Sequence, residues 1–107
     1  NDVIKNEEKI KAINIARGTI SEIKELSDKN VIIEKKLNEE YIFQQNIQCA
    51  EMYTKNDLEY TIDICFEDGD TDLPKQLVKV TVRVQHQVDR LAQTETFTYV
   101  NRDESDG

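Results

Sequence analysis

The chain has 107 residues, with 14 basic and 22 acidic side chains, a net charge of −8 and 37% hydrophobic residues. This length supplies one compact domain rather than two, so residues 1–107 are expected to form a single globular unit. The acidic balance argues against direct binding of nucleic acid, because phosphate contacts require a basic surface. No stretch approaches the ~18 consecutive apolar residues of a membrane-spanning helix.

The sequence offers little material for catalysis. Its single histidine, His86, stands among the polar residues Gln85, Gln87 and Asp89, a pattern typical of a surface loop. A catalytic base or a pH switch at His86 is the functional alternative. No serine or cysteine occurs in a nucleophile-elbow context that His86 would serve. We therefore expect no enzymatic activity and no cofactor.

Residues 12–26 predict an amphipathic helix, because their apolar side chains recur at helical spacing. The apolar face consists of Ala12, Ile13, Ala16, Ile20, Ile23 and Leu26. The polar face consists of Asn14, Arg17, Gly18, Ser21, Glu22 and Glu25. The helix should end near residues 27–30, where Asn30 can adopt the left-handed conformation that terminates helices.

The apolar stripe does not continue toward the N-terminus. Val3, Ile4 and Ile10 fall off it, and Lys9 falls on it. The helix should therefore pack on the body of the domain only from Ala12 onward. Residues 1–11 are predicted to protrude as a stalk, in which Ile4 and Ile10 are the candidates for contact with other subunits.

Three segments predict strands because apolar and polar residues alternate along them. Residues 58–66 should face inward through Leu58, Tyr60, Ile62, Ile64 and Phe66. Residues 77–85 should face inward through Val78, Val80, Val82 and Val84. Residues 93–100 are rich in threonine and aromatic residues, which favour a pleated surface.

The remaining segments give weaker patterns. Residues 47–53 are compatible with a further strand, residues 54–57 with a turn, and residues 31–37 are ambiguous. Residues 101–107 should form a loose tail. Together the segments predict an α+β domain, in which an N-terminal helix packs on an antiparallel sheet of three or four strands.

The helix and the strands together resemble the minor pilins of type IV pili and the minor pseudopilins of type II secretion. The resemblance is carried by residues 12–26, which match the helix of that family, and by the strands 58–66, 77–84 and 94–100. It covers about two-thirds of the chain. The family's prepilin cleavage site, its long apolar helix and the glutamate near the mature N-terminus do not occur in these residues.

The resemblance implies a structural subunit that primes filament assembly or lies at the filament tip. The chain would then be the soluble domain of a longer protein, attached to the membrane only through an apolar helix upstream. Its partners would be other minor and major pilins or pseudopilins and the inner-membrane assembly machinery. Its location would be the cytoplasmic membrane before assembly and the extracellular filament on the cell surface afterwards.

A free-standing secreted binding module is the alternative, since a helix covered by an antiparallel sheet is also the layout of cystatin-like inhibitors. Cystatins insert a Gln-x-Val-x-Gly hairpin into a protease cleft. Here residues 76–80 lack the glycine, and no tryptophan hairpin follows. A pilin requires an apolar helix upstream, whereas an inhibitor requires a cleavable signal peptide, so the upstream sequence separates the two.

The two cysteines, Cys49 and Cys65, are a candidate disulfide pair, because exported pilins of this kind encounter an oxidising environment. Adjacent strands can bring the two residues together, but the strand register decides whether they meet. Two separate thiols are the alternative. Two cysteines and one histidine are too few for a structural zinc site.

Three aspartates, Asp68, Asp70 and Asp72, alternate in a loop that bends at Gly69. Carboxylates at this spacing can converge on Ca²⁺. The spacing does not match an EF-hand, whose sixth and twelfth positions would here be Leu73 and Lys79. We therefore expect a solvated acidic turn between two strands and no resident metal.

Overall fold

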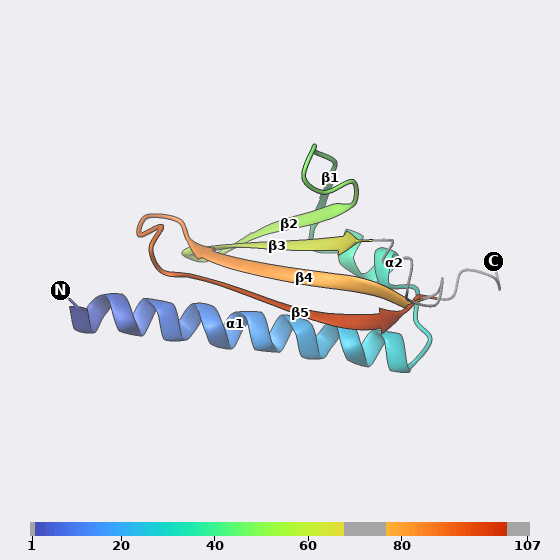
Figure 1. The fold of residues 1–107 in the computed structure, drawn as a ribbon, viewed down its shortest axis with the longest axis horizontal. Helices are drawn as coiled ribbons and strands as arrows, with labels where there is room; N and C mark the ends of the chain where they lie inside the picture. The colour runs from blue at the N-terminus through green and yellow to red at the C-terminus, as the bar shows by residue number, and fades with distance from the viewer. Residues whose placement is uncertain (1, 68–76, 103–107) are drawn as a thin grey trace.

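The computed structural model describes residues 2–67 and 77–102, and the side chains from Asn6 onward. The chain folds as an α+β domain in which a long N-terminal helix packs on one face of an antiparallel sheet (Figure 1). The sheet has five strands in sequential order, rather than the expected three or four. Its elements are α1 (Asp2–Asp28), α2 (Ile33–Asn38), β1 (Ile42–Gln44), β2 (Met52–Asp57), β3 (Tyr60–Glu67), β4 (Leu77–His86) and β5 (Gln93–Asn101).

Helix α1 runs from Asp2 to Asp28 and so includes the first turns that were expected to form a helical stalk. Its buried apolar face starts at Ala12, as the sequence indicated. Ala12 is the first fully buried residue, and Ala16 and Ile23 follow at helical spacing. Thr19, a residue absent from the predicted stripe, is also buried, and its hydroxyl donates to the Ile15 carbonyl oxygen at 2.8 Å. The whole predicted polar face is exposed.

The end of α1 has the geometry of a Schellman motif. Asn30 adopts φ 57°, as the sequence predicted. Its N–H donates to the Ser27 carbonyl oxygen at 3.1 Å, and the Val31 N–H donates to the Leu26 carbonyl oxygen at 3.0 Å. These two bonds satisfy carbonyl groups that a helix otherwise leaves unpaired at its C-terminus.

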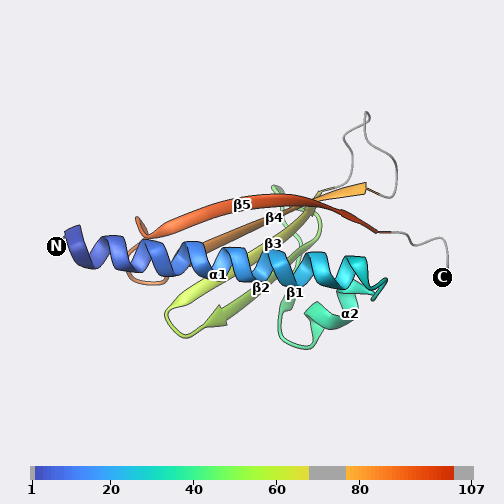
Figure 2. The same ribbon diagram turned by 90° about the horizontal axis from the view of Figure 1, so that it is seen from below.

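Strands β3 and β4 form the centre of the sheet, and α1 crosses it over β4 and β5 (Figure 2). The predicted alternation is confirmed for the valines of β4 and for four of the five predicted inward residues of β3. The core therefore lies between α1 and this face of the sheet. Its buried strand residues are Tyr53, Tyr60, Ile62, Ile64, Phe66, Val78, Val80, Val82, Val84 and Val100.

Two predictions around the β2–β3 connection were wrong. Residues 54–57 belong to β2 rather than to a turn. The turn lies one step later, at Leu58 and Glu59, and Leu58 adopts φ 56° with its side chain 92% exposed. The alternating pattern placed Leu58 in the core because Leu58 lies two residues before the inward-facing Tyr60. In the structure β2 ends at Asp57 and β3 begins at Tyr60, so Leu58 lies in the hairpin turn instead.

The ambiguous segment after α1 forms helix α2 and the short edge strand β1. Ile33 and Leu37 lie four residues apart and both point into the core. Tyr41 follows them and is also buried. This segment supplies the fifth strand and extends the cover on the helix side of the sheet beyond α1.

The prediction of a loose tail was wrong at its first two residues. Asn101 is the last residue of β5, and the side chain of Arg102 is only 12% exposed. Residues 103–107 lie outside the described residues.

Candidate functional site

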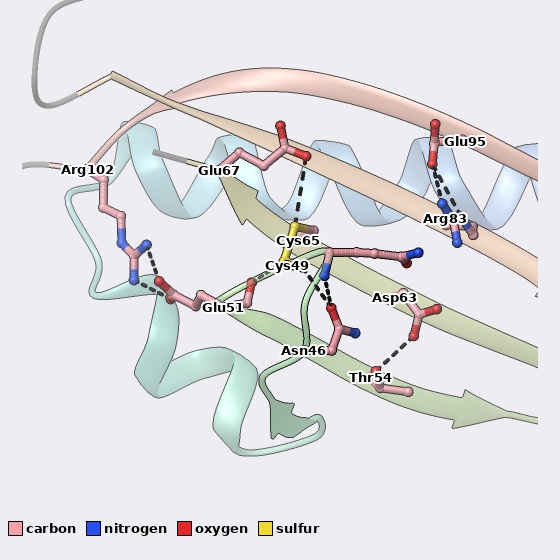
Figure 3. The surroundings of a disulfide bond; sticks show 11 residues. Asn46, Cys49, Glu51, Thr54, Asp63, Cys65, Glu67, Arg83, Glu95 and Arg102 are labelled. Carbon is pink, nitrogen blue, oxygen red and sulfur yellow. Dashed lines mark hydrogen bonds and ion pairs between the residues drawn. A yellow bond between two sulfur atoms is a disulfide. The ribbon is translucent and has the colours of Figure 1, made fainter. Parts of the chain in front are cut away.

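The two cysteines lie on the side of the sheet that faces away from α1. Cys49 belongs to the loop between β1 and β2, and Cys65 projects from β3 between the inward residues Ile64 and Phe66. The structure joins them in a disulfide with an S–S distance of 2.06 Å and a Cα–Cα distance of 6.2 Å (Figure 3). Cys65 lies opposite Met52, the first residue of β2, in the ladder between β2 and β3. The disulfide therefore attaches the loop that precedes β2 to the neighbouring strand β3.

Asn46 shapes the loop that presents Cys49. Its side-chain oxygen accepts the N–H groups of Gln48 at 2.9 Å and Cys49 at 2.7 Å (Figure 3). Its own N–H donates to the Cys49 carbonyl oxygen at 2.9 Å. Asparagine favours turns because its side chain can bond backbone N–H groups a few residues on, so Asn46 could have indicated that Cys49 lies in a loop rather than in a strand.

Arg102 connects the end of β5 to two other parts of the chain. Its guanidinium forms an ion pair with Glu51 before β2 (Figure 3). It also pairs with Glu34 of α2 and lies 4.7 Å from the centre of the Phe66 ring. Burial lowers the pKa of Arg102, but the hydrogen bonds and charges of Glu51 and Glu34 outweigh it and raise the pKa above its ordinary value. The three residues are up to 68 positions apart, so no sequence pattern could have revealed the cluster.

His86 is buried rather than exposed in a loop, which corrects the sequence prediction. It is the last residue of β4 and shares the inward parity of Val82 and Val84, and it is 6% exposed. Nδ1 accepts the N–H groups of Val88 at 3.2 Å and Asp89 at 2.9 Å. The proton of the neutral ring therefore lies on Nε2.

The Nε2 atom of His86 points toward the first turns of α1. It lies 3.8 Å from Glu8 Oε1 and 3.5 Å from Glu59 Oε2, and the His86 ring meets the Tyr60 ring edge-on at 5.1 Å. The Tyr60 hydroxyl donates to the Glu8 carbonyl oxygen at 2.9 Å. Glu8, Glu59, Tyr60 and His86 together form the N-terminal junction between α1 and the sheet. The helix is thus attached one turn earlier than Ala12.

Of the two predicted subunit-packing residues, Ile10 is 56% exposed on α1. The side chain of Ile4 lies outside the described residues. The described side chains before Ala12 are exposed except that of Glu8, which is partly buried in the N-terminal junction. Residues 2–11 belong to α1, and Ile10 directs an apolar side chain toward solvent.

The predicted calcium loop, with Asp68, Asp70 and Asp72, lies outside the described residues. Within residues 2–67 and 77–102, no group of three histidine, cysteine, aspartate or glutamate side chains is placed to hold a metal ion. Within the same residues no helix is both long and apolar enough to cross a bilayer. Neither observation supplies a chemical site.

Two tyrosines are held protonated by their surroundings. Burial, assisted by the charges of Glu22 and Glu40, raises the pKa of Tyr41 to about 12. Burial, assisted by Glu51, raises the pKa of Tyr53 to about 12. Both phenols are therefore neutral at physiological pH, and both residues are buried in the core.

The sheet face opposite α1 has no helix over it in the described part of the chain, and we call it the open face. It carries the disulfide, the Thr54–Asp63 hydrogen bond of 2.8 Å and the Arg83–Glu95 ion pair of 3.0 Å. Phe97 and Tyr99 of β5 are 56% and 44% exposed on it. The open face is thus a mixed polar and aromatic surface.

The chain was compared with protein families, curated proteins and solved structures. No family profile matches it, no curated protein is detectably similar, and no solved structure shows a significant likeness.

Proposed function

We propose that the chain is the globular head of a minor pilin or minor pseudopilin, a structural subunit of a type IV pilus or a related filament. The observation that carries the proposal is the asymmetry of α1. Its buried residues run from Ala12 to Ile23, whereas the described side chains before Ala12 include an exposed isoleucine, Ile10. A subunit whose helix joins a filament core needs such a division between a part that holds the head and a part that meets neighbours.

The fold supports the same proposal. An N-terminal helix lies along an antiparallel sheet, and both elements match the segments that resemble pilins (Figure 1). The disulfide is compatible with export to an oxidising compartment. In the proposed subunit, an apolar helix upstream anchors the precursor and then packs in the filament, while the open face is displayed to partner subunits.

The cystatin-like alternative loses support at β4. Residues 77–80, which would belong to the inserting hairpin, form part of a strand between β3 and β5. Val78 is 4% exposed and Val80 is fully buried. These side chains are not available to enter a protease cleft without dismantling the sheet.

The test is a charge introduced on the stalk. Ile10→Glu should reduce incorporation of the full-length subunit into filaments by about tenfold or more, because it places an unpaired carboxylate in an apolar subunit contact. The matched control is Asn14→Glu, which adds the same charge on the exposed polar face of α1.

Incorporation is measured by immunoblotting of sheared filaments, and the fold is checked by circular dichroism of the isolated domain. Ile10→Glu should leave the spectrum unchanged, since the side chain is 56% exposed. Equal incorporation of both variants and of the natural protein would overturn the assignment of Ile10 to a subunit contact.

A further inference from the structure

Strand β5 is the edge of the sheet, and its hydrogen-bonding pattern shows which backbone groups are free. The His86 N–H donates to the Ala92 carbonyl oxygen at 3.0 Å. His86 and Ala92 therefore form a hydrogen-bonded pair just beyond the Gln85–Gln93 pair. In an antiparallel ladder such pairs alternate with pairs whose N–H and C=O groups point away from each other.

The other end of β5 shows the same alternation between residues whose backbone groups point toward β4 and residues whose backbone groups point away from it. The Asn101 N–H donates to the Ser27 hydroxyl oxygen at 3.2 Å, and that hydroxyl donates to the Asn101 carbonyl oxygen at 3.1 Å. Asn101 thus directs both backbone groups away from β4. Counting by two from either end, the residues whose backbone groups point outward are Gln93, Glu95, Phe97, Tyr99 and Asn101.

Only Asn101 has partners for these outward groups among the described residues. The remaining four residues leave four N–H and four C=O groups in a row. Natural proteins usually protect such an edge with lysine, proline, a bulge or a short strand. Strand β5 is nine residues long, and its only charged side chain is Glu95.

The edge is flanked on one side by a row of α1. Ser27, which bonds Asn101, lies seven and fourteen residues from Ile20 and Ile13, so the three lie on one line of the helix. Ile13 and Ile20 are partly exposed. Both views show α1 running beside β5 along its length (Figures 1 and 2).

Two basic residues border this line. Arg17 and Lys24 follow Ile13 and Ile20 by four residues, and both are exposed. Within residues 2–67 and 77–102, neither has an acidic partner. Arg17 and Lys24 thus place two positive charges beside the edge, on a chain whose net charge is −8.

We propose that β5 is a docking site for an extended, acidic segment of a partner protein, which adds a sixth strand to the sheet. Its backbone pairs with Gln93, Glu95, Phe97 and Tyr99. One set of alternate side chains lies beside Phe97 and Tyr99, and the other set places carboxylates beside Arg17 and Lys24. A second copy of this chain is disfavoured, because the pairing would bring together two molecules of net charge −8. The inference stands on the fold and does not depend on the pilin assignment.

The probe is a capped nine-residue peptide of alternating valine and glutamate, with a valine–lysine peptide as its counterpart. Binding is followed by amide hydrogen exchange in NMR spectra. In the free protein, the amides of Gln93, Glu95, Phe97 and Tyr99 should exchange faster than those of Thr94, Thr96, Thr98 and Val100. The valine–glutamate peptide should slow the first group by about tenfold or more and leave the second group unchanged.

The charge argument is tested with variants. Arg17→Glu should weaken binding of the valine–glutamate peptide about tenfold and favour the valine–lysine peptide. The matched control, Lys35→Glu on α2, is also exposed and should change binding less than about twofold.

Three results would overturn the proposal. The first is no slowing of the four amides by either peptide. The second is equal binding of both peptides with no effect of Arg17→Glu. The third is slowing of the same amides in the protein alone as its concentration rises, which would assign the edge to a second copy.

Discussion

The two ends of α1 are attached to the sheet in different ways. The C-terminal end of α1 closes in a Schellman motif, and the Ser27–Asn101 hydrogen bonds join it to β5. The ion pairs of Arg102 then join the end of β5 to Glu34 of α2 and to Glu51. The disulfide fixes the neighbouring loop. At the N-terminal end, the described contacts are the hydrogen bond from the Tyr60 hydroxyl to the Glu8 carbonyl oxygen and the approach of His86 to the Glu8 carboxylate. We therefore expect the first turns of α1 to open more readily than its C-terminal end.

The largest expected effect comes from the disulfide. Replacing both cysteines, Cys49→Ser with Cys65→Ser, should lower the free energy of unfolding by about 3 kcal/mol, because the bond closes a short loop in the unfolded chain. The measurement is urea unfolding followed by circular dichroism. A reducing agent should shift the midpoint of the natural protein and not that of the variant. A variant with the same free energy of unfolding as the oxidised protein would show that the disulfide does not stabilise the fold.

The next effect comes from Arg102. Arg102→Gln should lower the free energy of unfolding by about 2 kcal/mol, because it leaves Glu34 and Glu51 partly buried without their cation. Combining Arg102→Met with Glu34→Gln and Glu51→Gln should recover most of the loss. Failure of this combination to recover stability would assign the effect to packing against Phe66 instead.

The buried tyrosines predict a loss of stability in alkali. The folded pKa of Tyr41 and of Tyr53 is raised to about 12, from an ordinary value near 10. Their contribution is fully present below about pH 10 and is lost as the pH rises toward 12, with a slope of up to about 1.4 kcal/mol per pH unit for each tyrosine. Unfolding by urea at pH 9 and pH 11 measures it.

The control for this titration is the pair of substitutions Tyr41→Phe and Tyr53→Phe. Together they should flatten the pH dependence between pH 10 and 12. An equally steep loss of stability in the double variant would attribute the alkaline effect to other groups.

The smallest effect is expected at the N-terminal junction. Tyr60→Phe should lower the free energy of unfolding by about 1 kcal/mol, since it removes one hydrogen bond to Glu8. It should also accelerate amide exchange in the first turns of α1 while exchange near Ile23 stays unchanged. The matched control is Tyr99→Phe on the open face. Uniform acceleration along the whole helix would contradict the distinction between the two ends.

The sequence predicted the parts of the fold that follow from local periodicity. The alternation in β4 and most of β3, the buried apolar face of α1 from Ala12 and the left-handed Asn30 are all properties of short windows. The attachment of α1 at Glu8 is not, because it depends on Tyr60 and His86. Helix α2 and β1 escaped because they are short, with six and three residues, and so contain too little of a periodic pattern. Leu58 was misplaced because parity along a strand contains no information about where a hairpin closes.

The sites were less accessible to sequence reasoning, because they combine distant residues. The Arg102 cluster joins α2, the loop before β2 and the end of β5, and the N-terminal junction joins α1 to β3 and β4. The inward position of His86 was nevertheless visible in its parity with Val82 and Val84. The free edge of β5 required the register of the ladder, which only the structure supplies.

The most direct test of the proposed function is the sequence of the native gene immediately upstream of Asn1. The pilin assignment predicts a short basic leader that ends in glycine, followed by phenylalanine or methionine and about 20 apolar residues that run into α1. A leader with a small-residue cleavage site directly before Asn1 would contradict it. The chain would then be a self-contained secreted domain, and its function would be sought in a partner protein.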